Sequence, residues 1–397
     1  MMRATVRVMV TVGLLLAGSS VGCSQQAPAA TPATPAVRPS RPALPAVART
    51  ERSRQITRYA RLLAGVDDPD AAPGDALRDG EGFRAHAREM AALWGHYKSI
   101  ESTKIRPWAE RSLAVVPDAP TVFYPFGGAD FLFPQAFFPK ARTYVLVGLE
   151  RVGVPADLEK LPAATLGPLY GRIRKAMTPL LKSSFFVTLE MQSDVYEDGM
   201  VSVLEALLAG AGHRIVETSL VSVGNDGTLK PRENVEVTRA KPGVRIDFVK
   251  DGETDVRSLY YFRMDISDKG LSSLGGLLPF VDALGPKVTF VKAASYCMHG
   301  SDFSMIRSYV LNNSLAILQD DTGVPYRYLE PARWDVRYFG LYTKPIAVFQ
   351  NYRQPALAEA FARGENVGPL DFRIGYGDSM ASHLLLAIKR TASAPAR

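Results

Sequence analysis

Cysteine is scarce in this chain of 397 residues, occurring only at positions 23 and 297. Two cysteines exclude the dense disulfide network that builds small secreted scaffolds. Spacings typical of metal ligands are also absent, since no His-x-x-x-His, Cys-x-x-Cys or calcium-loop pattern occurs. Beyond residue 50 there is no Gly-x-Ser-x-Gly elbow, P-loop or protein-kinase set. The sequence therefore predicts no metal and no cofactor, and it leaves open whether the protein is an enzyme.

Acidic residues and lysine are missing from residues 1–50, which contain five arginines. The whole chain has 47 Lys and Arg against 40 Asp and Glu, a formal charge of +7. Taking away the five arginines leaves 42 basic and 40 acidic groups, a net charge of +2 for the remaining 347 residues. Because that part is nearly neutral, charge gives no support for nucleic acid as a partner.

Residues 1–22 have the layout of a secretory signal peptide. Arg3 and Arg7 precede the apolar run Val8–Ala17, and small residues follow. The run has about ten residues, whereas a helix that crosses a bilayer needs roughly 20. We therefore expect an export signal, and a buried N-terminal helix is the alternative.

The segment from Ser20 to Cys23 resembles the lipobox of bacterial lipoproteins, in which the cysteine is acylated and becomes the first residue. Gly22 and Cys23 match that motif, while Ser20 stands where leucine is usual. The resemblance implies a lipid anchor of the palmitate type on Cys23. Ser24, in place of aspartate, implies the outer membrane of a Gram-negative cell, on its periplasmic or surface face. The alternative is a conventional signal peptide with an unrelated cysteine.

Composition divides the rest of the chain into three parts. Residues 23–50 are rich in proline and alanine, which favours an extended polyproline II tether. Residues 51–116 show apolar side chains at helical spacing and predict a helical arm or cap. Residues 117–397 alternate between strand and helix patterns, which predicts an α/β domain with mixed α+β additions.

A βαβ unit opens the predicted α/β domain. Strands are expected at 121–125 and 144–149, with a helix at 131–138 between them, as in a degenerate Rossmann-like core. Residues 243–267 predict a β-hairpin with its turn at Asp251-Gly252. Further strands are expected at 185–190, 214–223, 287–295, 315–318, 372–376 and 384–388, and further helices at 166–182, 200–211, 271–284, 303–312 and 356–362.

The first candidate site combines Gly127, Gly128 and Asp130 with Glu150, twenty residues after Asp130. Glycines at a strand-to-helix turn allow a ligand to approach, and an acid after the next strand can bind a ribose hydroxyl. The layout is similar to the first βαβ unit of Rossmann-like methyltransferases, but it lacks their spaced Gly-x-Gly. Nucleotide binding, a repurposed cleft and a turn packed by aromatic side chains remain open.

The second candidate site is the segment Tyr296-Cys297-Met298-His299. If it ends a strand, Cys297 and His299 share one face and can form a nucleophile and base. An accessible thiol is open to oxidation in an exported protein, so we expect Cys297 to be structural and His299 to be functional. Tyr296 is a candidate ligand-binding residue.

The third candidate site is Asp320-Asp321, which follows an apolar strand. Adjacent carboxylates can act as acid and base or bind a cation, and they also commonly cap a turn. The aromatic stretch at 326–342 can bind sugars or peptides through its ring faces, or it can form a packed β-layer or aromatic core.

Four of these segments together resemble a family of bacterial exported, lipoprotein-like sequences without a known activity. They are the runs at 123–132, 137–150, 294–299 and 317–325. The resemblance assigns no reaction and no site residue.

The leading hypothesis is therefore a membrane-anchored envelope lipoprotein whose α/β domain binds a small molecule or an envelope partner. One alternative is an envelope hydrolase that uses an acid/base pair among Asp130, His299, Asp320 and Asp321. The other is a structural or assembly factor of the cell envelope.

Overall fold

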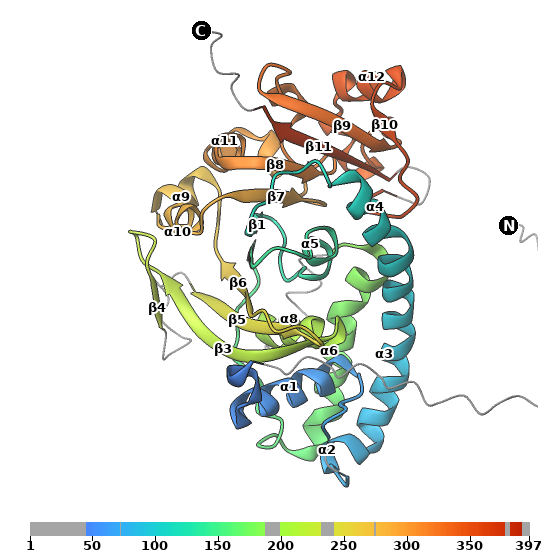
Figure 1. Cartoon of the computed structure of the whole chain (residues 1–397), viewed down its shortest axis with the longest axis vertical. Helices are drawn as coiled ribbons and strands as arrows, with labels where there is room; N and C mark the ends of the chain where they lie inside the picture. The colour runs from blue at the N-terminus through green and yellow to red at the C-terminus, as the bar shows by residue number, and fades with distance from the viewer. Residues whose placement is uncertain are drawn as a thin grey trace, which may run out of the picture. The chain divides into compact units, whose positions relative to one another are not determined.

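The computed structural model describes residues 45–71, 73–186, 199–231, 242–273, 275–377 and 382–390. Residues from Pro42 onward form one compact unit (Figure 1). The predicted signal peptide, Cys23 and most of the predicted tether lie outside the described residues.

Within the described residues, eleven strands form one sheet in the order β10-β9-β11-β8-β7-β1-β2-β6-β5-β3-β4. Both parallel and antiparallel pairs occur, and helices are interspersed along the chain, which confirms the predicted α/β class. The strand bounds are β1 Thr121–Tyr124, β2 Thr143–Gly148, β3 His213–Val223, β4 Leu229–Pro231, β5 Pro242–Lys250, β6 Arg257–Arg263, β7 Lys287–Val291, β8 Ser314–Gln319, β9 Trp334–Gly340, β10 Val367–Gly368 and β11 His383–Lys389.

The five central strands, β8, β7, β1, β2 and β6, are all parallel to one another. The chain adds β2 and β6 on one side of β1 and later adds β7 and β8 on the other. Counted by chain order, these strands are arranged 3-2-1-4-5, as in doubly wound sheets. The order reverses between β1 and β7, and in such sheets ligands bind beyond the carboxyl ends of the strands at this point.

Antiparallel strands extend the sheet on both sides of the parallel centre. β11 lies between β8 and β9 and is antiparallel to both. β5 is antiparallel to β6 and to β3, so the predicted hairpin is confirmed. The predicted βαβ unit is also confirmed, because β1 and β2 are parallel and helix α5 lies between them in the chain.

Helices cover both faces of the sheet (Figure 1). In β1, Val122 and Tyr124 face one core, which the helices α1, α3, α4, α5, α6 and α8 complete, while Phe123 faces a second core with α9 to α12. This alternation is the period of two of a strand buried on both faces. The helix bounds are α1 Glu51–Ala64, α2 Ala76–Asp79, α3 Glu81–Ile100, α4 Arg106–Ser112, α5 Leu132–Phe137, α6 Ala163–Ser183, α8 Met200–Gly210, α9 Asp268–Ser273, α10 Leu277–Ala283, α11 Ser304–Asn313 and α12 Pro355–Arg363.

The residues predicted as a helical arm belong to the same core as the sheet. Helix α1 packs on both α8 and β3. The hydroxyls of Ser53 and Thr57 donate to the carbonyl of Ile215 in β3, at 2.6 and 3.1 Å. Ala48 is buried in the 3-10 turn Ala46–Arg49, so the folded part begins a few residues before the predicted tether ends.

Several predicted elements are wrong in their bounds. Strand β7 ends at Val291 and not at 295, and the helix expected at 271–284 is divided into α9 and α10. Residues 372–376 do not form a strand, while β9, in the aromatic stretch, was missed. The strand expected at 185–190 lies mostly outside the described residues.

Among the helices that the structure describes, none is both long and apolar enough to cross a membrane.

Candidate functional site

The segments that follow β1, β7 and β8 come together at one edge of the sheet. These strands are parallel neighbours, so their carboxyl ends lie side by side. The structure places Asp130, Tyr296, Asp320 and Asp321 in this region, all with buried side chains. His299 joins them half-buried.

A buried ion pair joins the segments after β1 and β7. The ammonium of Lys292 lies 2.7 Å from Oδ2 of Asp130, and the two side chains are 1% and 2% exposed. Oδ1 of Asp130 accepts the backbone N–H of Phe133 at 3.2 Å, and the hydroxyl of Tyr124 donates to Oδ2 at 3.3 Å. Burial raises the pKa of Asp130, and the Lys292 charge opposes that rise. The carboxylate is therefore hydrogen-bonded from three sides.

Lys292 has two further contacts. Its ammonium donates to the carbonyl of Ser184, the residue that follows α6, and lies 4.5 Å from the ring centre of Phe133. A cation at a helix carboxyl end and over an aromatic face is favourably placed. Sequence reasoning missed Lys292, although a lysine directly after a fully buried strand signals a charge that needs a partner.

Asp320 holds the turn that follows β7. Its Oδ2 accepts the backbone N–H of Ala293 at 2.8 Å, and its Oδ1 accepts that of Thr322 at 2.9 Å. Burial raises the pKa of Asp320, and the neighbouring Asp321 raises it further. Gly375 packs directly on this carboxylate, because a Cβ there would overlap Oδ2 of Asp320. Asp130 and Asp320 are therefore connected through Lys292 and Ala293, which are adjacent in the chain.

The turn after β7 has an unusual backbone. Ala293, Ser295 and Tyr296 have φ values of 50°, 49° and 56°, in the left-handed region that non-glycine residues rarely adopt. Such conformations cost about 1–3 kcal/mol each and persist only where the surroundings enforce them. Here Asp320 holds the N–H of Ala293, and the Tyr376 hydroxyl donates to its carbonyl at 2.9 Å. Clusters of such residues are typical of functional sites.

Asp321 takes part in a second buried cluster, with Tyr296 and His383. The Tyr296 hydroxyl donates to Oδ2 of Asp321 at 2.5 Å. Nε2 of His383 lies 3.1 Å from Oδ1 of Asp321 and also 3.1 Å from its backbone nitrogen. A proton on Nε2 is donated to the carboxylate, and without it Nε2 accepts the backbone N–H. Burial, followed by the Asp321 charge, raises the pKa of Tyr296, which therefore remains a donor.

These three residues line a pocket of about 360 Å³, which we name the β8 pocket. This volume lies within the range of small-molecule sites, about 300–1,000 Å³. The rest of the wall comes from the segment after β9, from the 3-10 helix Ala347–Tyr352 and from the residues before β11. The other lining residues are Thr343, Lys344, Pro345, Ile346, Ala347, Gln350, Arg353, Tyr376 and Gly377.

Cys297 and His299 do not share a strand face as expected, because they lie in the 3-10 turn Cys297–His299. The His299 ring packs edge-on against Tyr296 and Tyr352. Burial lowers the pKa of His299 to about 4, so the imidazole is neutral at physiological pH. Burial raises the pKa of the Cys297 thiol, which leaves it without the activation that a nucleophile needs.

Gly127, Gly128 and Glu150 form a packed corner at the ends of β1 and β2. A Cβ at Gly127 would overlap the Tyr124 ring, and Gly128 closely approaches Gly148. Oε2 of Glu150 accepts the N–H of Leu149 and the hydroxyl of Tyr261, both at 3.1 Å. Among the described residues, no recorded hydrogen bond or ion pair joins Glu150 to Asp130 or Asp320.

His383 is the site residue with the weakest signal in the sequence, and it was not predicted. It lies 62 residues after Asp321 and begins β11, an apolar strand. One polar side chain at the start of the run Leu384-Leu385-Leu386 was the available signal. The histidine that contacts the Asp321 carboxylate is thus His383, whereas the sequence predicted a functional role for His299.

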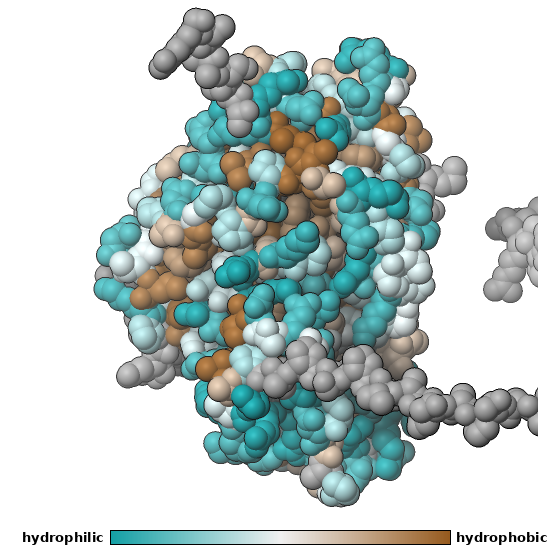
Figure 2. Space-filling model, viewed as in Figure 1, coloured by the Kyte–Doolittle hydropathy of each residue, from teal (hydrophilic) through white to brown (hydrophobic). Residues whose placement is uncertain are grey.

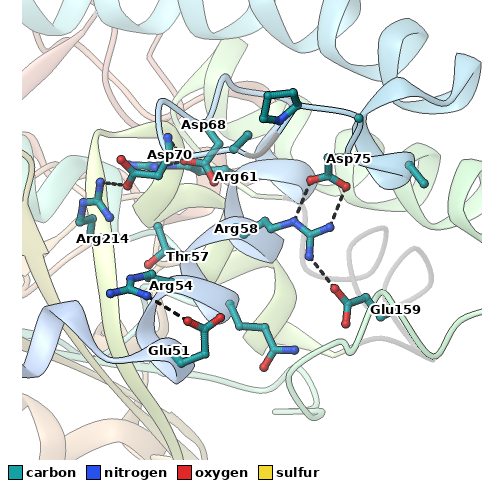
Figure 3. Close-up of a pocket in the computed structure, with 15 residues that line it drawn as sticks. Glu51, Arg54, Thr57, Arg58, Arg61, Asp68, Asp70, Asp75, Glu159 and Arg214 are labelled. Atoms are coloured by element: carbon teal, nitrogen blue, oxygen red, sulfur yellow. Dashed lines mark hydrogen bonds and ion pairs between the residues drawn. The ribbon is translucent and has the colours of Figure 1, made fainter.

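A second pocket, of about 490 Å³, lies beside α1 and is named here the α1 pocket (Figure 3). Its arginines are paired: Arg54 with Glu51 at 3.0 Å, and Arg58 with both Asp75 at 2.7 Å and Glu159 at 2.6 Å. The remaining pairs are Arg61 with Asp68 and Arg214 with Asp70. Hydrophilic side chains cover the end of the molecule that holds α1 and α2 (Figure 2).

No cluster of three or more His, Cys, Asp or Glu side chains suited to a metal ion occurs in the described parts of the chain. No protein-family model matches this chain, and no curated protein matches it.

Proposed function

We propose that the chain is a lipid-anchored protein of the bacterial cell envelope, whose α/β domain binds a small molecule in the β8 pocket. The observation that carries the binding role is the buried group Asp321, His383 and Tyr296 in the wall of an open pocket. Concave pockets with a few convergent polar groups are the usual form of ligand sites.

The location supports the same proposal. The β8 pocket lies at the carboxyl end of a parallel strand, two strands from β1, where the strand order reverses. The turn after β7 contributes Tyr296 and keeps its strained backbone. A protein has no need of strain for stability, so its presence favours a role in ligand recognition.

A fragment screen with nuclear magnetic resonance tests the binding role. We expect fragments that bind to shift the His383 imidazole signals and to lose affinity in His383→Gln. Arg54→Gln, in the α1 pocket, is the matched control and should leave binding unchanged. The proposal fails if no fragment shifts the His383 signals.

The anchor and its place in the outer membrane rest on the sequence around Cys23. Labelling of cells with palmitate, with and without Cys23→Ala, tests the anchor directly. Loss of label in the variant supports acylation of Cys23, whereas label retained in the variant refutes it. Fractionation of the labelled cells then tests whether the protein is in the outer membrane.

A hydrolase is the second candidate, because Asp321 and His383 form an acid/base pair in an open pocket. With the Nε2 proton donated to Asp321, the other ring nitrogen of His383, Nδ1, can take a proton from an attacking water and return it to the leaving oxygen, while Asp321 stabilises the imidazolium. Loss of such a base costs about 10²- to 10⁴-fold in rate. Equal hydrolysis of p-nitrophenyl esters by the wild type and by His383→Gln would exclude this candidate.

The third candidate function, a structural or assembly factor, does not depend on the β8 pocket. It requires a protein partner that is retained when the β8 pocket is disrupted. Pull-down of such a partner, together with no binding of small molecules, would favour this role over both other functions.

A further inference from the structure

Two cations stand at the mouth of the β8 pocket. Lys344 and Arg353 both line it, and both residues are exposed. Among the residues that the structure describes, neither forms an ion pair with a carboxylate. Lys344 comes from the segment after β9, and Arg353 directly follows the 3-10 helix Ala347–Tyr352. Two separate segments therefore bring positive charge to one opening.

The carboxylate inside the pocket is already compensated. Tyr296 donates to one oxygen of Asp321, and His383 lies against the other. Asp320 is likewise committed to the backbone of Ala293 and Thr322. The oxygens of both buried acids thus have contacts inside the protein, and within the described residues no ion pair joins these acids to Lys344 or Arg353, so the two cations can contact a ligand.

The α1 pocket shows what compensated cations look like in the same protein. Arg58 donates to both oxygens of Asp75 and also to Glu159, and dashed lines mark these contacts in Figure 3. An anion that entered there would have to displace a carboxylate. Lys344 and Arg353 present no such competitor from the described residues.

We propose that the β8 pocket binds a small organic anion, a carboxylate or a phosphate ester, with its charged group between Lys344 and Arg353. The uncharged end of the ligand points inward, to His383. This inference rests on the proposed function and adds the chemical class of the ligand. A cationic ligand is disfavoured because it would meet two like charges at the opening.

The size of the pocket supports a small ligand over a macromolecule. A volume of about 360 Å³ is near the lower limit of small-molecule sites. The polar groups that the ligand would reach, Asp321 and His383, are buried, and a flat protein surface would not reach them. An extended acidic peptide, unlike a flat surface, could enter the pocket, so it is the rival ligand that the experiment must detect.

The test uses two matched probe pairs. Phenyl phosphate is compared with benzyl alcohol, and 4-hydroxybenzoate with 4-hydroxybenzamide, in titrations of the full chain at low ionic strength. We expect each anion to bind at least tenfold more tightly than its neutral counterpart and to shift the His383 signals. The double variant Lys344→Gln/Arg353→Gln should weaken anion binding about tenfold or more, which corresponds to about 1.4 kcal/mol, because it removes the charged groups that would bind the anion.

Arg54→Gln removes one positive charge from the α1 pocket and should leave anion affinity unchanged. Equal affinity for anion and neutral probe, or full affinity in the double variant, would overturn the inference, as would no anion binding at millimolar concentration. If neutral probes still shift His383, the binding role stands and only the preference for anions fails. Binding of a poly-glutamate peptide in place of the small anions would select the rival.

Discussion

The α1 pocket and the β8 pocket contain similar residue types but differ in how their charges are used. In the α1 pocket the arginines are paired with carboxylates from α1, from the N-cap of α2 and from neighbouring loops. In the β8 pocket Lys344 and Arg353 have no carboxylate partner among the described residues, while Tyr296 and His383 contact the two oxygens of Asp321. The number of charged residues in a pocket therefore says little about its role, and the pairing pattern says much more.

The two regions also differ in how the backbone is used. Around the α1 pocket, Thr50 and Asp75 form ordinary helix N-caps, whose side chains accept backbone N–H groups at 3.1 Å. Beside the β8 pocket, Ala293, Ser295 and Tyr296 hold left-handed conformations. The backbone around the α1 pocket is therefore unstrained, whereas the backbone beside the β8 pocket retains strain at the site where we expect binding.

The largest effect should come from the buried pair that supports the strained turn. Lys292→Met leaves Asp130 buried and unpaired, which we expect to lower the free energy of unfolding by about 3–5 kcal/mol. Urea unfolding at neutral pH measures this loss. Lys287→Met, at the other end of β7, breaks a pair whose Asp282 partner is half exposed, so it should cost much less.

The double variant Asp130→Asn/Lys292→Met removes both charges and should recover part of the stability. If Lys292→Met alone costs no more than Lys287→Met, the buried pair does not support the site as described.

The second-largest effect should be a pH dependence of stability that comes from Glu205 in α8, the helix on which α1 packs. Burial raises the pKa of Glu205 from 4.5 to about 7, opposed by a 2.7 Å hydrogen bond from Thr218. The folded protein keeps this proton between about pH 4.5 and 7 while the unfolded chain loses it. The free energy of unfolding should therefore fall across that range, by up to about 3 kcal/mol, and level off above it.

Glu205→Gln should remove this part of the pH dependence. The free energy of unfolding of the variant should therefore rise relative to that of the wild type between pH 5 and pH 8. Unfolding curves at pH 5 and pH 8 provide the measurement. A wild-type minus variant difference that does not change with pH would show that Glu205 is not ionised in this way.

Gly375→Ala should have a smaller effect, confined to the site. The glycine has φ 58°, and a Cβ would overlap Asp320. We expect a loss of about 2 kcal/mol and weaker ligand binding, because Asp320 must move away from Ala293. Gly364→Ala is the control, with φ 72° and open space around it. Equal losses in the two variants would mean that strain alone, and not the contact with Asp320, explains the result.

The smallest effect should come from the α1 pocket itself. Arg58→Gln breaks the contacts to Asp75 and Glu159, and we expect a cost of about 1 kcal/mol because Arg58 is partly exposed. The loss should shrink at high salt, since screening weakens such pairs. Ligand binding in the β8 pocket should not change. A change in binding would contradict the separation of the two regions.

The sequence contained enough information for the local elements of the fold. The strands β1 and β2 with α5 between them follow from apolar runs and a glycine turn, and the β5–β6 hairpin follows from alternation around Asp251-Gly252. Strand β9 was missed although Trp334, Val336 and Tyr338 alternate with the polar Asp335 and Arg337, because the stretch around it was interpreted from its aromatic content alone. The end of β7 was placed too late because composition does not reveal the left-handed backbone of Ala293.

The candidate site was predicted only in part, because only some of its residues carry a local signal in the sequence. Asp320 and Asp321 were found because they follow an apolar strand, which is a local signal. Lys292 and His383 were not found because their roles depend on which strands become neighbours in the sheet. The pairing of Asp321 with His383 joins β8 to β11, and pairing across 62 residues is not visible in a single sequence.

The order of the sheet has a mechanical consequence. Where the chain enters the fold, α1 is fastened to β3, seven strands from β11, which is roughly 30 Å at the usual strand spacing. A pulling force on the N-terminal segment would first load the 3-10 turn Ala46–Arg49, in which Ala48 is buried, and then the contacts of Ser53 and Thr57 with Ile215. Those contacts and the α1 pocket would absorb the load, so a protein held by its N-terminus could be pulled without distorting the β8 pocket.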